Sequence, residues 1–287
     1  SVSYNNFGKF EYTNMADKAA KYKGFTGDDV TAIPGFVNYS EGIYVGYKFY
    51  ETASDEGLIN YDDTVAFPFG YGLSYTSFDQ KLDSVKYKGG KVTVTATVTN
   101  TGDKAGKDVV EVYYNPPYTD GGIEKASKNL AGFEKTKELQ PGESQKVTVK
   151  FDDDDMASYD YKGAKAYVLE KGDYDISIQS DSHHVIDHKA ITVKDTVTYD
   201  SDSNTHNGDK TVATNQFDDV AGDVTYLSRA DHFANYKEAT AAPTNFKMSD
   251  KAKETFYNNS NYDPKKFDKD SDKMPTTGAK NVLKLSD

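Results

Sequence analysis

The stretch of sequence that decides the fold reads VTVTATVT, from Val92 to Thr99. Its four apolar residues lie on one side of an extended chain, because successive side chains of a β-strand point to opposite faces. Threonine at the positions between them is typical of a strand with one face on a core and the other in water. The stretch therefore predicts a half-buried antiparallel strand at Lys91–Asn100.

The same alternation recurs along residues 79–195 and predicts seven further strands. They are expected at Leu82–Lys88, Lys107–Asn115, Asn129–Lys137, Ser144–Phe151, Ala164–Glu170, Asp173–Ser180 and Val185–Val193. Turn sequences such as Gly89-Gly90 and Pro116-Pro117 separate them. Short strands at such intervals favour a mainly β fold, an antiparallel sandwich of the immunoglobulin or fibronectin type III kind.

Long irregular extensions are expected on both sides of this sandwich. Residues 1–78 have weak periodicity, and they predict an extended strap with one short helix, within Asn14–Tyr22 and capped by Asn14. Residues 196–287 are polar except for two apolar islands, Val220–Tyr236 and Val282–Leu285. Segments 200–210 and 258–273 bury too little apolar surface to offset the cost of ordering, so we expect them to be mobile.

Composition excludes several classes of function. The 34 Lys and Arg residues face 46 Asp and Glu residues, a net charge of -12, so no nucleic-acid partner is expected. Cysteine is absent, which excludes disulfides and thiolate chemistry and leaves the cellular compartment undecided. Apolar runs are far shorter than the roughly 20 residues of a membrane span. The chain starts at Ser1 without a signal pattern, which suggests a start inside a longer protein.

Two polar clusters are candidate metal sites, and both have simpler explanations. Asp152–Asp155 offers oxygen ligands for calcium, but it lacks the ligand spacing of an EF-hand loop and equally suits a turn that caps a short helix at Met156–Tyr159. His184 and His188 would share a face of a strand about 13 Å apart, too far for one ion. Surface roles are favoured for these histidines and for His183, so no metal or cofactor is predicted.

Aromatic residues are abundant, with 23 tyrosines and 15 phenylalanines. Aromatic rings stack on sugars, so a carbohydrate-binding module is one interpretation. Strands also favour these residues, and large rings bury much area where domains meet. Composition alone favours this second interpretation.

Several motifs, in order, carry a more specific resemblance. They are Tyr39–Glu51 (YSEGIYVGYKFYE), Phe67–Phe78 (FPFGYGLSYTSF), Val94–Asp103, Ala105–Tyr114 (AGKDVVEVYY), Leu130–Thr136 (LAGFEKT), Pro141–Ser144 (PGES) and Met156–Asp160 (MASYD). This series resembles the end of the α/β sandwich and the fibronectin type III-like domain of glycoside hydrolase family 3, which consists mostly of β-glucosidases.

The C-terminal region extends the resemblance. Phe217–Asp231 and Met274–Asp287 are similar to the connector of members with inverted domain order, in which the catalytic barrel comes last. The resemblance implies a trailing strap of the α/β domain at 1–78, the fibronectin type III-like domain at 79–195, and a connector towards a missing barrel at 196–287.

The resemblance also implies that the catalytic residues lie elsewhere. The family nucleophile is an Asp in the barrel, commonly just before a Trp, and this chain has no Trp. The family's Lys-His pair is missing as well, and the acid/base Glu belongs upstream of the segment that resembles Tyr39–Glu51. Glu41 and Glu51 match neither role. We therefore expect no catalytic, substrate-binding or metal-binding residue in this chain, and no cofactor.

The implied function is structural: a non-catalytic part of a β-glucosidase that positions the catalytic domains for hydrolysis of terminal β-glucosides. Its partners would be the catalytic domains of the same polypeptide, with the carbohydrate bound only through the parent enzyme. The alternatives are an independent carbohydrate-binding or cell-surface adhesion module and an enzyme with an unfamiliar site. A binding module should present several exposed rings on one face, and an enzyme should cluster acids in a concave pocket.

The expected domain contacts are the residues of an aromatic–glycine segment. They are Phe67, Pro68, Phe69, Gly70, Tyr71, Gly72, Leu73 and Tyr75. Pro68 would stiffen the segment, and Gly70 and Gly72 would allow close backbone approach. Because Tyr71, Leu73 and Tyr75 share one face of an extended chain, we expect them to pack against the sandwich.

Overall fold

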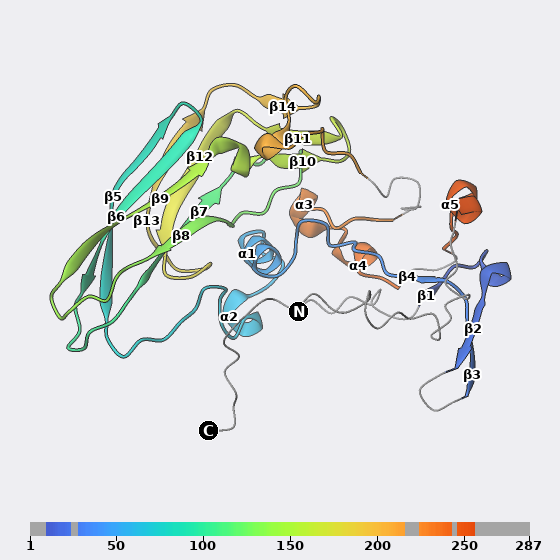
Figure 1. The fold of residues 1–287 in the computed structure, drawn as a ribbon, viewed down its shortest axis with the longest axis horizontal. Helices are drawn as coiled ribbons and strands as arrows, with labels where there is room; N and C mark the ends of the chain where they lie inside the picture. Colours follow the sequence, from blue (N-terminus) through green and yellow to red (C-terminus); the bar gives the residue numbers. More distant parts are fainter. Residues whose placement is uncertain (1–9, 24–27, 216–223, 243–245, 256–287) are drawn as a thin grey trace, which may run out of the picture. The chain divides into compact units, whose positions relative to one another are not determined.

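The computed structural model describes residues 10–23, 28–215, 224–242 and 246–255 (Figure 1). They belong to two compact units. The larger unit contains Val37–Thr244, and the smaller one combines Lys9–Phe36 with residues from Asn245 onward. The second apolar island of the sequence, Val282–Leu285, and segment 258–273 lie outside the described residues, as does Met274–Asp287.

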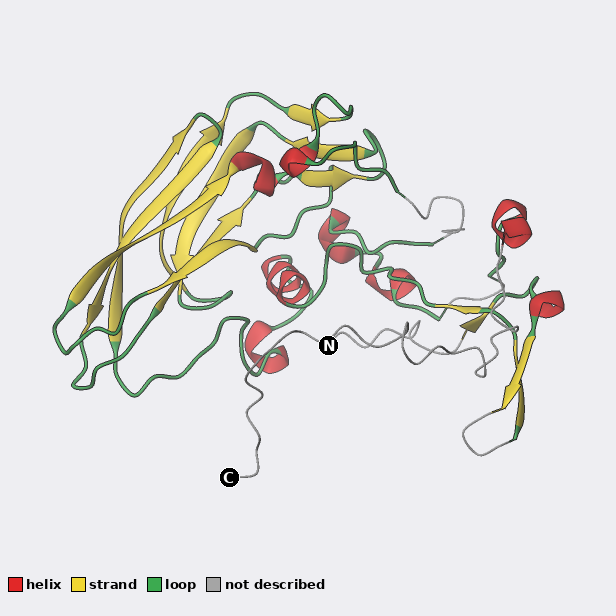
Figure 2. Cartoon of the chain, viewed as in Figure 1, coloured by secondary structure: helices red, strands yellow, loops and turns green. Residues whose placement is uncertain are grey.

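Two antiparallel sheets form the sandwich of the larger unit (Figures 1 and 2). The first sheet has the order β5-β6-β9, with strands Phe78–Lys88, Lys91–Asn100 and Ser144–Asp152. The second has the order β13-β12-β7-β8, with strands Val185–Val193, Gly172–Gln179, Val109–Asn115 and Asn129–Lys135. The mainly β, fibronectin type III-like fold is thus confirmed.

The core of the sandwich follows from the alternation in β6. Val92, Val94, Ala96 and Val98 are buried, whereas the threonines between them are only half-buried. Their apolar side chains belong to one cluster with residues of the facing sheet, including Val110, Val112, Tyr174, Ile176 and Ile178. Burying each large apolar side chain contributes roughly 1.5–3 kcal/mol, so this cluster supplies much of the stability of the unit.

A third, smaller sheet lies beside the sandwich, in the order β10-β11-β14. Its strands are Ser158–Asp160, Ala166–Leu169 and Val197–Tyr199. The short helix expected at Met156–Tyr159 is wrong, because the helical turn is η2, Asp153–Met156. Asp152 and Asp155 cap that turn reciprocally, in a capping box, so the aspartate run serves as a helix start.

The N-terminal part of the larger unit is more helical than the sequence predicts. Helices α1 (Tyr47–Asp55) and α2 (Tyr61–Thr64) replace the expected extended strap. Phe49 and Ala53, four residues apart, are both buried on one side of α1. The residues that bury this side of α1 come from distant parts of the chain, as described below. The spacing of apolar residues within α1 is therefore a weak predictor of this helix.

The part of the C-terminal extension up to residue 242 belongs to the larger unit. It contains the 3₁₀ turn η3 (His206–Gly208) and the short helices α3 (Ala230–Phe233) and α4 (Tyr236–Ala239). Within segment 200–210, the ring of His206 stacks on Tyr167 with centroids 3.9 Å apart, and its Nε2 lies 2.9 Å from the Asp154 carbonyl. None of the described helices has the length and apolar character needed to cross a membrane.

The smaller unit contains short hairpins and one helix. Strand β1 (Phe10–Glu11) pairs with β4 (Gly35–Phe36), β2 (Ala20–Lys23) pairs with β3 (Asp29–Ala32), and α5 spans Asp250–Thr255. Of the one or two helical turns expected around Asn14–Tyr22, one forms as the three-residue 3₁₀ turn η1 (Ala16–Lys18), and strand β2 starts at Ala20. Asn14 does not cap η1, since its amide donates to the Met248 carbonyl at 2.8 Å and its oxygen accepts from the Met248 N–H at 2.9 Å.

The difference in burial between two isoleucines predicts how much each contributes to the stability of the sandwich. Ile176 on β12 is fully buried, so Ile176→Ala should lower the free energy of unfolding by about 2–5 kcal/mol. Ile186 on the neighbouring strand β13 is 40% exposed, and Ile186→Ala should cost far less. Urea titrations of both variants measure this, and equal losses would contradict the assigned core.

Candidate domain-contact site

The aromatic–glycine segment, residues 67–75, runs from α2 to β5, and its first half is anchored to the sandwich. Phe69 is the anchor: its ring stacks on Tyr47 of α1, with centroids 4.7 Å apart and planes 17° apart. Its carbonyl accepts a hydrogen bond from the Ser182 N–H at 2.8 Å. Phe69 thus joins α1, segment 67–75 and the turn between β12 and β13.

Gly70 lets the backbone pass closely over β7. Its φ is +87°, in the region that favours glycine, and a Cβ at this position would overlap the carboxylate of Glu111. Glu111 accepts a hydrogen bond from the Tyr113 hydroxyl at 2.7 Å, and burial raises the pKa of this carboxyl. At Gly70 the backbone therefore passes close to Glu111. At Gly72 a Cβ would have open space.

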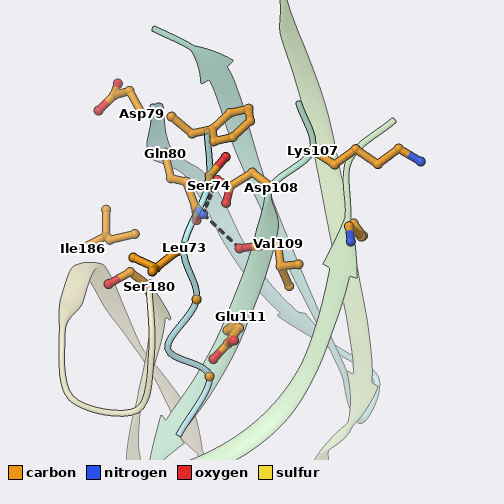
Figure 3. Close-up of a pocket in the computed structure, with 14 residues that line it drawn as sticks. Leu73, Ser74, Asp79, Gln80, Lys107, Asp108, Val109, Glu111, Ser180 and Ile186 are labelled. Carbon is orange, nitrogen blue, oxygen red and sulfur yellow. Dashed lines mark hydrogen bonds between the residues drawn. The ribbon is translucent and has the colours of Figure 1, made fainter. Parts of the chain in front are cut away.

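A groove of about 610 Å³ runs beside this segment, and both polar and apolar side chains line it (Figure 3). Gln80 on β5 reaches across it and donates from Nε2 to Asp108 at 2.8 Å and to the Val109 carbonyl at 3.0 Å. Burial raises the pKa of Asp108. Two of the three acids that line the groove are therefore held by donors of the sandwich itself, Asp108 by Gln80 and Glu111 by Tyr113, and Asp79 is the third.

The second half of the segment does not pack as the sequence predicts. Leu73 is 89% exposed and Tyr75 is fully exposed, so the expected packing of these two residues against the sandwich is wrong. The groove beside them is lined by the polar Gln80, Asp108 and Glu111 and also by the apolar Phe78, Val109 and Ile186, but these side chains do not cover Leu73 or Tyr75. Phe67 and Tyr71 are also exposed, with ring centroids 5.0 Å apart. The segment thus presents its apolar side chains to solvent.

A second apolar core joins the two extensions to the sandwich. We call it the junction core, and it contains Tyr44, Phe49, Ala53, Ala126, Leu227, Phe233 and Ala239. Phe233 meets Tyr44 edge-on, with centroids 5.0 Å apart, and lies 5.9 Å from Phe49. Residues nearly 190 positions apart in sequence therefore share one buried cluster.

The loop between β7 and β8 supplies the sandwich side of this junction. Its Glu124 is buried and accepts three hydrogen bonds: from the Tyr44 hydroxyl at 2.7 Å, the Ser228 hydroxyl at 2.5 Å and the Arg229 N–H at 2.9 Å. Ser127 in the same loop bonds α1 twice, through Thr52 at 3.0 Å and Asp55 at 2.5 Å. One loop thus holds both extensions.

Arg229, the single arginine of the chain, completes the junction. Its Nε donates to Glu56 at 2.5 Å, its Nη1 donates to the Lys125 carbonyl at 3.1 Å, and its guanidinium lies 4.2 Å from the centroid of the Tyr118 ring. Burial alone would raise the pKa of Glu56, but hydrogen bonds from Arg229 and His232 outweigh it and hold that pKa below its ordinary value.

A third attachment involves a buried carboxylate of α1. Glu51 accepts hydrogen bonds on Oε1 from Tyr61 at 2.7 Å and from Ser182 at 2.6 Å, and its Oε2 lies 2.9 Å from Nδ1 of His183. The ring of His183 stacks on Tyr61 at 3.7 Å. Sequence reasoning matched Glu51 to no role, and the structure gives it a structural one.

The histidines named in the sequence do not gather around a common point. His183 meets Glu51, His184 meets Asp181 at 2.9 Å, and His188 meets Asp175 at 2.8 Å. Asp175 raises the pKa of His188 through a hydrogen bond. Over residues 10–23, 28–215, 224–242 and 246–255, no group of three or more metal-ligating side chains is found.

This chain is similar in sequence to a known domain family and to several known proteins. Residues 108–182 match the family described as a fibronectin type III-like domain. β-Glucosidase A of Butyrivibrio fibrisolvens is 42% identical over 170 residues, which cover 53% of this chain and 19% of that protein. A β-glucosidase of Ruminococcus albus is 42% identical over 162 residues, covering 55% and 16%. The chain thus spans less than a fifth of these curated relatives.

Solved structures give the same picture. β-Glucosidase 3B from Thermotoga neapolitana, in complex with α-D-glucose, is 34% identical with a TM-score of 0.50, and the match covers 57% of this chain and 21% of that one. A β-glucosidase from Paenibacillus barengoltzii is 37% identical with a TM-score of 0.50, covering 56% and 18%. About half of this chain therefore corresponds to one part of larger enzymes.

The two glycines of the segment form a matched pair for a test of the close approach. Gly70→Ala combines a strained φ with an overlap on Glu111, and it should lower the free energy of unfolding by about 1–3 kcal/mol. Gly72→Ala meets no atom within 4 Å and should leave stability nearly unchanged. Thermal melts of both variants measure this. Equal melting temperatures would show that the segment is not seated on β7.

The ion pair of Glu56 predicts a pH dependence. Because its pKa is lower in the folded chain than in the unfolded chain, the ionised carboxylate stabilises the fold above the ordinary value of 4.5, and this contribution is lost as the pH falls through the folded pKa. The stability difference between the parent and Glu56→Gln should therefore be largest above about pH 5 and shrink towards pH 3.

Glu134 on β8 is exposed and provides the control for this pH series. Glu134→Gln should track the parent at every pH. A difference between the parent and Glu56→Gln that stays constant between pH 3 and pH 7 would contradict the role of the Glu56 charge.

Proposed function

The chain carries the fibronectin type III-like domain of glycoside hydrolase family 3 β-glucosidases, and from this we propose that it positions the catalytic domains of such an enzyme for hydrolysis of terminal β-glucosides. The observation that carries the proposal is the junction core. It attaches α1, which precedes the sandwich, and the segment around Phe233, which follows it, to one loop of the same sandwich. The two flanking segments thereby leave the unit at fixed positions.

A fixed junction has a clear use in glycoside hydrolysis. A retaining glycosidase needs two carboxylates about 5–5.5 Å apart across one sugar. When they come from different domains, small changes in domain orientation change this distance, and correct orientation contributes several kcal/mol to lowering the barrier. In this proposal the present chain supplies orientation, and domains outside it supply the carboxylates.

Segment 67–75 is proposed as a further contact with those domains. Leu73 and Tyr75 project from it into solvent while Phe69 and Gly70 hold its backbone in place. Covering a large apolar side chain contributes roughly 1.5–3 kcal/mol, so a partner surface here would add stability to the assembled enzyme. The full contact set is Phe67, Pro68, Phe69, Gly70, Tyr71, Gly72, Leu73 and Tyr75.

The two alternative functions find less support. An independent carbohydrate-binding or adhesion module has no need of a buried junction that fixes the segments on both of its sides. An enzyme would need acids that are free to act, whereas two of the three acids in the groove, Asp108 and Glu111, are held by Gln80 and Tyr113. An assay of the purified chain on aryl β-glucosides should therefore show no turnover, and activity abolished by Asp108→Asn or Glu111→Gln would overturn the proposal.

Exposed residues of segment 67–75 give the sharper prediction. In the 287-residue chain, Leu73→Ala and Tyr75→Ala should leave the melting temperature unchanged, because both side chains are exposed. In the full-length enzyme that the proposal requires, the same changes should lower both stability and activity, because a domain contact is lost. Tyr39→Ala, which removes another exposed ring, is the matched control. Full-length variants that behave like the parent would exclude segment 67–75 as a contact.

A further inference from the structure

A cavity of about 380 Å³ in the larger unit is walled mainly by tyrosines. It lies between the β10–β11 hairpin, the turn at Gly42–Tyr44, the β7–β8 loop and the C-terminal extension. The four tyrosines that line it beside Tyr44 are Tyr159, Tyr161, Tyr167 and Tyr226. Its volume lies within the range of small-ligand pockets.

These four tyrosines differ from those that build the fold. Tyr113 and Tyr174 are completely buried, whereas all four in the cavity are only half-buried. Among the described residues, Tyr159, Tyr161 and Tyr226 belong to neither of the two apolar cores. Their rings are therefore not explained by core packing.

The rings are held in two edge-to-face pairs. Tyr161 and Tyr226 have centroids 5.5 Å apart, and Tyr159 and Tyr167 have centroids 5.3 Å apart. One face of Tyr167 is already stacked on His206, and the ammonium of Lys162 lies 5.3 Å from the Tyr161 centroid, so stacking by a ligand would use Tyr226 and the remaining face of Tyr161. The cavity wall is thus amphipathic, with flat apolar faces and phenolic hydroxyls.

The β10–β11 hairpin fixes two of these tyrosines in place. Asp160, between Tyr159 and Tyr161, accepts hydrogen bonds through its side chain from the N–H groups of Lys162, Gly163 and Ala164 at 3.2, 2.8 and 2.8 Å. The Tyr159 hydroxyl donates to the Lys165 carbonyl at 3.1 Å. A wall ordered in this way loses little conformational entropy when a ligand binds.

Charge in the cavity selects against ionic ligands. The buried carboxylate of Glu124 lines it and would repel an anion. The ammonium of Lys162 lies 3.8 Å from Glu124 and 5.3 Å from the centroid of the Tyr161 ring, and it already fills the role of a cation on this aromatic wall. A neutral ligand with one apolar face and several hydroxyls fits best.

We propose that this cavity binds a pyranose ring of a neutral saccharide, with the tyrosine faces against its C–H surface and the phenolic hydroxyls at its hydroxyl groups. The cavity shares Tyr44 and Leu227 with the junction core, whereas the four half-buried tyrosines proposed to contact the sugar lie outside both that core and segment 67–75. This binding gives the chain a direct contact with carbohydrate.

The test is an NMR titration of the 287-residue chain, carrying ¹³C-labelled tyrosine rings, with cellobiose and with maltose. Either sugar should shift the ring signals of Tyr161 and Tyr226 in a saturable manner. Sorbitol, a polyol without a ring, should not. No saturable shift with either sugar, or equal shifts with sorbitol, would overturn the proposal.

Variants separate stacking from other effects. Tyr161→Ala and Tyr226→Ala should each weaken binding about tenfold, whereas Tyr161→Phe, which keeps the ring, should retain most of it. Tyr39→Ala, outside the cavity, should bind like the parent. Thermal melts check folding, and a folded Tyr161→Ala variant with parental affinity would overturn the proposal. If both alanine variants fail to fold, the ring shifts of the parent still decide it.

Discussion

The junction core is the interaction on which the attachment of the two extensions to the sandwich depends. Phe233 from the C-terminal extension, Tyr44 and Phe49 from the N-terminal one, and Ala126 from the β7–β8 loop bury one another. Removing a large aromatic side chain from such a site typically costs about 3–5 kcal/mol, a large fraction of the stability of a domain. Without this core, the extensions would be held by separate contacts, such as those of Glu51 with Ser182 and of His206 with Tyr167.

Polar contacts around the junction core fix the orientation of the two extensions relative to the sandwich. Apolar contacts alone are not directional, whereas Glu124 and Arg229 each bond several groups in one geometry. Leaving either charge unpaired in this partly buried site would be costly, so alternative registers of the two extensions are disfavoured. The junction therefore combines apolar burial for stability with charged hydrogen bonds for a unique arrangement.

The sequence predicted the parts whose signals are local. β6 was readable because Val92–Val98 carries its whole pattern, and the predicted strand bounds lie within a few residues of the observed ones. Strands β1, β2, β3, β4, β10 and β14 were missed. Helix α1 was missed because the residues that bury Phe49 lie near position 233. The packing of Leu73 and Tyr75 was mispredicted because alternation shows that two side chains share a face, but not whether an apolar surface lies opposite. The apolar island Val220–Tyr236, which contains Leu227 and Phe233, was the local sign of the junction.

The most direct test of the account is hydrogen–deuterium exchange on the parent chain and on Phe233→Ala. In the parent, amides of α1 should be protected. In Phe233→Ala, protection should fall together in α1 and in the segment 226–240, while β6 in the sandwich core stays protected, because the junction core is a separate cooperative unit. Protection of α1 that does not change in Phe233→Ala would contradict the central claim that one core holds both extensions.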